Sequence, residues 1–120
     1  MITGMGLDII ELDRIRRIIE RQPGFIKRIL TINEIERFVT LSKERKVEFL
    51  AGRFAGKEAY SKAVGTGIGE EVSFQDIEIT NNDRGKPILR PLKEFAEPMT
   101  IHISITHTRQ YAAAQVILER

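Results

Sequence analysis

The sequence predicts an α+β fold in which N-terminal helices, one of them long, pack on a small, mainly antiparallel sheet. Apolar residues recur at helical spacing through the first half of the chain, whereas the second half alternates polar and apolar residues as half-buried strands do. Turns rich in glycine and asparagine separate the later segments. The 120 residues contain no repeat, linker or low-complexity segment, so we expect a single domain over residues 1–120.

The first half of the chain is predicted to be helical after one short strand. Apolar residues at helical spacing indicate the first helix, and Pro23-Gly24 ends it. Thr31 or Asn33 can cap a later helix, because either side chain can accept a backbone hydrogen bond. The expected elements are, in order, a strand over 2–9, a helix over 11–22, a helical turn over 25–30, a helix beginning after residue 31 and a long helix over about 43–64.

The second half is predicted to consist of two antiparallel strand pairs. In the segment 99–106, Ile101, Ile103 and Ile105 share one face and polar residues share the other. A return strand over 111–118 can pair with it. The other pair is a hairpin with a β-rich segment over 72–79, a turn over 81–85 and a short strand over 87–90.

Composition excludes several classes of protein. Nineteen Lys and Arg against seventeen Asp and Glu leave a net charge of only +2, which is too small for a dedicated binder of duplex nucleic acid. The absence of cysteine excludes disulfides, thiolate metal sites and thiol catalysis. No segment has the roughly 20 apolar residues of a membrane span, and the N-terminus lacks the pattern of a signal peptide. We therefore expect a cytoplasmic protein with no membrane or nucleic-acid partner.

The long helix carries two charged residues on its apolar stripe. Stepping by four residues from Leu50 and Phe54 leads to Glu58 and then to Lys62. A simple ion pair between residues i and i+4 is one explanation, and a functional site is the other. The opposite face of this helix is expected to carry ordinary solvated charges, at Lys46, Arg53 and Lys57.

Asp8 is the second unusual residue, because it follows Gly4 and Gly6 in a strand that glycine weakens. Glycines at these positions allow close approach of another backbone or of a ligand. Asp8 can also be the N-cap of the helix that follows. If Asp8 and Glu58 meet, their carboxylates form an oxygen site suited to Mg²⁺ shared with phosphate.

Three further features allow both a structural and a functional interpretation. The glycine-rich segment 65–69 follows a helix, unlike nucleotide-binding fingerprints, so we expect a helix C-cap whose amides could still approach a phosphate. His102 is expected to make a structural hydrogen bond. Small residues form a stripe on the long helix that permits close packing on the sheet or on another helix, at Gly52, Gly56, Ala59 and Ala63.

Two segments in order resemble the signatures of 4′-phosphopantetheinyl transferases: Gly4-Met5-Gly6-Leu7-Asp8 and Phe54-Ala55-Gly56-Lys57-Glu58-Ala59-Tyr60-Ser61-Lys62. The resemblance covers nearly the whole chain. Three other segments are similar to the short, stand-alone bacterial branch of this family, the holo-acyl-carrier-protein synthases: Gly65-Thr66-Gly67, Gly85-Lys86-Pro87 and Ser104-Ile105-Thr106-His107-Thr108.

This resemblance implies Mg²⁺-dependent transfer of phosphopantetheine from coenzyme A to a serine of apo acyl carrier protein, in fatty acid biosynthesis. It further implies that Asp8 and Glu58 are metal ligands and that Lys62 faces the pyrophosphate. The larger branch of the family has a second carboxylate where this chain has Ile10, so a water would replace it. Glu58, directly or through water, is the candidate base for the serine proton.

The remaining implied contacts are to coenzyme A and to the carrier protein. The short branch is a homotrimer with sites between subunits, and we expect the same here. On the helix over 11–22, Arg14, Arg17 and Arg21 fall roughly 130° from the apolar set, where they would dock an acidic carrier protein. The candidate residues for coenzyme A are Arg45, Arg53, Lys62, Gly65, Thr66, Gly85, Lys86, Pro87 and His107.

Other functions remain open at this point. A transferase of the same family can serve a polyketide or peptide-synthetase carrier. An RNA-binding module or a structural interaction subunit belongs to a different class, but the eight aromatic residues lie mostly at apolar-periodic positions and form no basic-aromatic motif.

Overall fold

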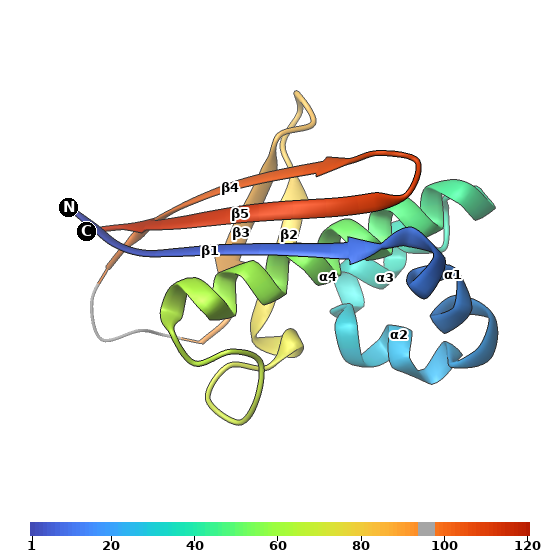
Figure 1. Cartoon of the computed structure of the whole chain (residues 1–120), viewed down its shortest axis with the longest axis horizontal. Helices are drawn as coiled ribbons and strands as arrows, with labels where there is room; N and C mark the ends of the chain where they lie inside the picture. The colour runs from blue at the N-terminus through green and yellow to red at the C-terminus, as the bar shows by residue number, and fades with distance from the viewer. Residues whose placement is uncertain (94–97) are drawn as a thin grey trace.

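The structure, a computed structural model, describes residues 1–93 and 98–120. Figure 1 shows the long helix α4 lying across one face of a twisted sheet, with the shorter helices gathered at one end and both chain termini at the other. The elements are β1 (Ile2–Glu11), α1 (Leu12–Arg21), α2 (Pro23–Ile29), α3 (Ile32–Phe38), α4 (Lys43–Val64), a 3₁₀ turn (Phe74–Asp76), β2 (Ile77–Asn81), β3 (Pro87–Pro91), β4 (Thr100–His107) and β5 (Tyr111–Glu119). The predicted α+β fold class is confirmed.

The main sheet is antiparallel and has the strand order β1-β5-β4. Its inner face packs on α4, and Ile101, Ile103 and Ile105 of β4 are on this inner face as their alternation predicts. The strands β2 and β3 form a separate antiparallel hairpin that packs beside β4. Among the described residues, no helix has the length and apolar character to cross a membrane.

Two glycines let β1 lie directly on the backbone of α4. A Cβ atom added to Gly6 would lie 1.8 Å from the carbonyl oxygen of Ala59, and one added to Gly4 would lie 2.1 Å from that of Ala63. No other residue type fits these positions without moving the strand or the helix. The predicted close approach is therefore an approach of backbone to backbone. Asp8, two residues further on the same face of the strand, is carried to the side of α4.

The stripe of small residues on α4 is used inside the chain. A Cβ atom on Gly56 would lie 2.6 Å from Cδ1 of Ile79, and one on Gly52 would lie 3.2 Å from Cγ2 of Ile105. Ala59 and Ala63 are buried under β1. The stripe therefore packs the helix on its own sheet, and it gives no support for a second copy of the chain.

Several predicted boundaries change where a side chain closes a turn. The β-rich segment 72–79 becomes strand only at Ile77, because the Asp76 carboxylate accepts hydrogen bonds from the backbone and hydroxyl of Ser73 and holds a 3₁₀ turn. The cap of α3 is Thr31 rather than Asn33, in a capping box with Glu34. The predicted strand segment over 99–106 extends one residue further, so that His107 is the last residue of β4.

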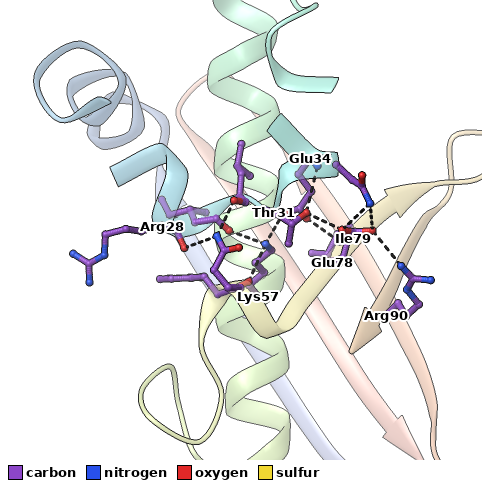
Figure 2. A network of polar contacts seen from close by, with 12 residues as sticks. Arg28, Thr31, Glu34, Lys57, Glu78, Ile79 and Arg90 are labelled. Atoms are coloured by element: carbon purple, nitrogen blue, oxygen red, sulfur yellow. Dashed lines mark hydrogen bonds and ion pairs between the residues drawn. The ribbon is translucent and has the colours of Figure 1, made fainter. Parts of the chain in front are cut away.

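The predicted solvation of Lys57 is wrong. Its ammonium is fully buried and donates to the Glu34 carboxylate at 2.6 Å, to the Ile29 carbonyl at 2.7 Å and to the Phe74 carbonyl at 3.1 Å. Glu34 also accepts from the backbone amides of Thr31 and Ile79. Figure 2 shows this cluster joining α4 to α3, β2 and the end of α2. Burial lowers the pKa of Lys57, and the Glu34 carboxylate acts against this change.

Candidate active site

The close packing of β1 on α4 brings Asp8 to Lys62. The Lys62 ammonium donates to Oδ1 of Asp8 at 2.9 Å and to the Leu7 carbonyl at 3.1 Å. Asp8 is not a helix cap, because the N-cap of α1 is Glu11. The capping alternative for Asp8 is thereby excluded, and an ion pair links the two predicted site residues across the strand and the helix.

Glu58 lies one helical turn before Lys62, within the electrostatic reach of Asp8. Burial raises the pKa of Glu58, and the negative charge of Asp8 raises it further. The cations of Lys62 and Arg14 act in the opposite direction. Two carboxylates thus repel one another at this point, and a cation bound between them would relieve the repulsion.

One oxygen of this site lacks a partner. Oδ2 of Asp8 is buried and accepts no hydrogen bond from the described residues. A buried acceptor of this kind is costly unless a ligand satisfies it. Within residues 1–93 and 98–120 no three metal-ligating side chains gather, so Asp8 and Glu58 would supply only part of a coordination shell. This donor set suits Mg²⁺, which keeps several waters and shares the oxygens of bound phosphates.

A cleft of about 840 Å³ opens elsewhere on the molecule, between α3, the first half of α4, the β2–β3 hairpin and the end of β4. Five residues predicted to contact coenzyme A line it: Arg45, Arg53, Gly85, Pro87 and His107. The cleft therefore gathers residues from four separate segments of the chain.

Arg53 is buried in the wall of this cleft, which contradicts its predicted solvation. The guanidinium lies 4.1 Å from the centre of the Phe49 ring and donates to the Asn81 side chain at 2.6 Å. Its Nε has no hydrogen-bond partner among the described residues. Burial lowers the pKa of Arg53 to about 10, so the group remains a cation at neutral pH. A buried cation with a free donor favours an anionic ligand in the cleft.

The two histidines make different contacts. Nε2 of His107 lies 3.0 Å from the Glu48 carboxylate in the cleft wall. Nε2 of His102 lies 3.0 Å from the Glu119 carboxylate on the exposed face of the sheet, which is the structural hydrogen bond predicted for it.

The other predicted contacts to coenzyme A lie outside the cleft lining. Gly65 ends α4 in the left-handed conformation, as predicted for a C-cap. The backbone amides of Gly65, Thr66 and Gly67 all point to the Ser61 carbonyl, so in this conformation they are occupied. The amide of Lys86 donates to the Asn82 side chain, and its own side chain is exposed.

The Asp8–Glu58–Lys62 group and the cleft lie on different faces of α4. At 100° per residue, Glu58 and Lys62 point roughly 130° away from the cleft residues of the same helix. Arg45 and Lys62 are separated by about 25 Å along the helix axis, at 1.5 Å per residue. Within one chain the helix therefore stands between the two groups.

The basic stripe of α1 is exposed as predicted. Arg14, Arg17 and Arg21 all reach solvent, while Leu12, Ile15 and Ile18 are buried. The Arg14 guanidinium also lies 5.9 Å from the Phe54 ring centre, so the stripe begins beside the Asp8–Glu58–Lys62 group.

The contacts of two carboxylates, Glu34 with Lys57 and Glu48 with His107, were not predicted from the sequence. Glu34 carries a usable signal, since Thr31 and Glu34 have the spacing of a capping box. Lys57 follows the buried Leu50 by seven residues and so shares its helix face. Glu48 has no such signal, because only the fold places it beside His107.

Comparison with known proteins shows the family of the chain. Residues 4–116 match the model of the 4′-phosphopantetheinyl transferase superfamily. The chain therefore belongs to this superfamily, which makes it a transferase of the phosphopantetheine group. Among curated proteins it is 59% identical to the holo-[acyl-carrier-protein] synthase of Bacillus velezensis, over all of this chain and 98% of the relative, and 56% identical to that of Bacillus subtilis with the same coverage.

Solved structures give the same result. The crystal structure of a holo-(acyl-carrier-protein) synthase from Bacillus anthracis, in complex with CoA (3′,5′-ADP), has a TM-score of 0.91 at 55% identity and covers 99% of this chain and 97% of its own. The Helicobacter pylori enzyme in complex with coenzyme A has a TM-score of 0.84 at 34% identity, covering 96% and 99%. The resemblance predicted from the signature segments is confirmed.

Proposed function

We propose that this chain transfers 4′-phosphopantetheine from coenzyme A to a serine of apo acyl carrier protein, leaving holo acyl carrier protein and adenosine 3′,5′-bisphosphate. The observation that carries the proposal is the Asp8–Glu58–Lys62 group, set in the two signature segments of the family. Such a transfer needs neutralised charge on the pyrophosphate and a positioned hydroxyl more than it needs covalent catalysis.

Asp8 and Glu58 are the proposed ligands of Mg²⁺. The unpartnered Oδ2 of Asp8 and the mutual repulsion of the two carboxylates support this role. When bound, Mg²⁺ would neutralise charge on the phosphate oxygens as a Lewis acid.

Glu58 and Lys62 have separate proposed roles in the transfer step. The serine oxygen attacks the phosphorus that carries pantetheine, and the bond from that phosphorus to the bridging oxygen of the pyrophosphate breaks. Glu58, directly or through a water that it holds, is the proposed acceptor of the serine proton. Lys62 stabilises the phosphate of the departing adenosine 3′,5′-bisphosphate.

The cleft is the proposed site for the 3′-phosphoadenosine end of coenzyme A. Arg45 and Arg53 supply positive charge there, Arg53 has a free buried donor, and the His107 imidazole lines the same cleft. Gly85 and Pro87 form part of its wall. Lys86 is proposed at its rim, with Gly65 and Thr66 near the pyrophosphate beside Lys62.

The active sites are proposed to lie between the subunits of a homotrimer. One ligand must reach the cleft and the Asp8–Glu58–Lys62 group, yet α4 separates them within a chain. The cleft of a neighbouring copy, placed beside Asp8, would complete the site. The outer face of the sheet offers a surface for such contacts, because Met5, Leu7 and Ile9 are each at least 60% exposed.

A mixed-subunit experiment tests the shared site. Glu58→Ala and Arg45→Ala variants are each expected to be inactive, and an equal mixture assembled together should recover about a quarter of wild-type transfer, because a quarter of the interfaces then pair two intact halves. Sedimentation equilibrium of the wild type should give three times the chain mass. A fully active monomer would refute the shared site.

The carrier protein is proposed to dock on Arg14, Arg17 and Arg21. Acidic helices of carrier proteins would be steered to this stripe, which begins beside Phe54 and the transfer site. The proposed setting is fatty acid biosynthesis in the cytoplasm.

Mass spectrometry of an apo carrier protein tests the function. After incubation with coenzyme A and this chain, the carrier should gain one phosphopantetheine when Mg²⁺ is present and none in excess chelator. Carriers from fatty acid, polyketide and peptide synthesis tested side by side would identify the substrate class. No mass gain on any carrier with Mg²⁺ would refute the proposal.

A further inference from the structure

Asn81, the last residue of β2, connects two walls of the cleft through its side-chain amide. Its Oδ1 accepts a hydrogen bond from Nη2 of Arg53 on α4 at 2.6 Å, and its Nδ2 donates to the Gly85 carbonyl in the β2–β3 turn at 2.9 Å. All three residues line the cleft, and Arg53 is buried. The amide therefore joins the buried cation of α4 to the turn of the hairpin.

The two partners fix the orientation of the Asn81 amide. A guanidinium can only donate and a backbone carbonyl can only accept, so Oδ1 must face Arg53 and Nδ2 must face Gly85. Turning the amide by 180° would break both hydrogen bonds. An aspartate at this position could accept from Arg53, but it could not donate to the Gly85 carbonyl.

The amide holds Arg53 without cancelling its charge. Within the described residues Arg53 forms no ion pair, and its one side-chain hydrogen bond is to Asn81. The Glu34 carboxylate, whose charge also acts on Arg53, is bonded to Lys57. The guanidinium is further held by the Phe49 ring, 4.1 Å from the ring centre. A neutral acceptor thus orients the cation and leaves its charge available to an anion.

We propose that Asn81 is a positioning residue that fixes the Arg53 guanidinium beside the β2–β3 turn, with its charge free for the 3′-phosphate of coenzyme A. This role rests on the proposed function, because it takes coenzyme A as the ligand of the cleft. Its consequence is that Asn81 contributes to the discrimination between coenzyme A and dephospho-coenzyme A, which lacks the 3′-phosphate.

The kinetic test compares both coenzymes in wild type, Asn81→Ala and Asn81→Asp. Asn81→Ala should raise KM for coenzyme A about three- to tenfold, because Arg53 loses the acceptor that orients it, with kcat and the KM for dephospho-coenzyme A little changed. Asn81→Asp should raise KM for coenzyme A about tenfold or more, because a carboxylate there cancels the charge of Arg53 and repels the phosphate. Urea unfolding midpoints should stay close to wild type, since Asn81 is exposed at the end of its strand.

The neighbouring Asn82 provides the matched control, because its side chain holds only the turn. Its Oδ1 accepts from the backbone amides of Arg84 at 2.9 Å and Lys86 at 3.0 Å, and within the described residues it has no hydrogen bond to Arg53. Asn82→Ala should therefore change KM for both coenzymes by the same factor, whereas Asn81→Ala should change their ratio. The same change of ratio in both variants would mean that the turn alone sets the discrimination, and would overturn the role of Asn81.

Calorimetry supplies a readout that needs no turnover. Asn81→Ala should weaken binding of adenosine 3′,5′-bisphosphate about three- to tenfold and leave binding of adenosine 5′-monophosphate unchanged. In an Arg53→Met background, Asn81→Ala should weaken bisphosphate binding no further, because the cation through which Asn81 acts is gone.

Two further results would overturn the proposal. An equal rise in KM for both coenzymes in Asn81→Ala would mean that Asn81 only supports the cleft wall. Tighter or unchanged bisphosphate binding in Asn81→Ala would mean that Asn81 competes with the phosphate for Arg53 or does not act on it. Failure of wild type to transfer from coenzyme A would refute the proposed function instead, and bisphosphate calorimetry would still test Asn81 in that case.

Discussion

Two lysine–carboxylate pairs lie five residues apart on α4, and they are built in opposite ways. Lys57 and Glu34 are 0% and 1% exposed, and both charged groups use their hydrogen-bonding capacity within the chain. Lys62 and Asp8 are 49% and 14% exposed, and Oδ2 of Asp8 is buried without a partner in the described residues. We call the first pair saturated, because its charged groups have all their hydrogen-bonding partners within the chain. The second pair is unsaturated, because Oδ2 of Asp8 has none among the described residues.

The difference separates scaffold from site. A buried charged group whose hydrogen bonds are all made within the chain cannot bind a ligand. Its removal leaves the partner charge buried without a counter-charge. The saturated pair ties α4 to α3, to β2 and to the turn before β2 (Figure 2), and thereby fixes the helix that presents Glu58. The unsaturated pair keeps an oxygen free at the point where two carboxylates meet.

The largest effect is expected from removing either carboxylate of the site formed by Asp8, Glu58 and Lys62. Asp8→Ala or Glu58→Ala should lower the transfer rate by at least about a thousandfold, since a Lewis-acid metal contributes several kcal/mol to such a transition state. Circular dichroism should show a folded protein, because both groups are partly exposed and no backbone bond depends on them. A folded variant with a near-wild-type rate would remove that residue from the site.

A smaller effect, present at neutral pH and lost in acid, is expected for the buried cluster around Glu34 and Glu78. Burial acts to raise the pKa of Glu78, but hydrogen bonds from Thr31 and Asn33 and the charges of Arg90 and Lys57 outweigh it, so the pKa is lowered. A carboxylate of lowered pKa stabilises the fold above its unfolded pKa, and this contribution is lost as the pH falls through the folded pKa.

Glu78→Gln should therefore cost about 1–2 kcal/mol of unfolding free energy at pH 7. The difference from wild type should shrink as the pH is lowered from 5 to 3. Urea unfolding across this range measures it. A difference that stays constant with pH would show that the ionised carboxylate adds nothing to the cluster.

The smallest effect concerns the exposed stripe of α1, whose charges are screened over about 8 Å at physiological salt. Arg14→Glu, and more weakly Arg21→Glu, should raise KM for the carrier protein and flatten its salt dependence, with KM for coenzyme A little changed. Carrier kinetics that stay the same in both variants across a salt titration would place the docking surface elsewhere.

Local patterns in the sequence were enough for much of this structure. The spacing of apolar residues predicted α4 with its observed bounds, and Gly4 and Gly6 predicted a close approach at β1. Asp8, Glu58 and Lys62 were found because charges interrupted apolar patterns. These signals are local, so one sequence contains them.

Contacts between distant segments were not predictable in this way. Lys57 was predicted to be solvated because the α2–α3 segment that buries it lies about twenty-five residues earlier. The residues next to Lys57 in the sequence give no indication of that packing. The same holds for Arg53, and for Glu48 beside His107. The stripe of small residues was visible in the sequence, but only the fold shows that its own sheet covers it.

The same substitution at both lysines tests the central contrast most directly. Lys57→Met should lower the unfolding free energy by about 3–5 kcal/mol, because it strands the buried Glu34 charge, and should transfer at close to the wild-type rate where it is folded. Lys62→Met should change stability by less than about 1 kcal/mol and lose most of its transfer activity. Denaturant unfolding and carrier-labelling rates, measured on both variants under the same conditions, decide the matter. Equal losses of stability in the two variants, or full activity in Lys62→Met, would contradict the division into a saturated scaffold and an unsaturated site.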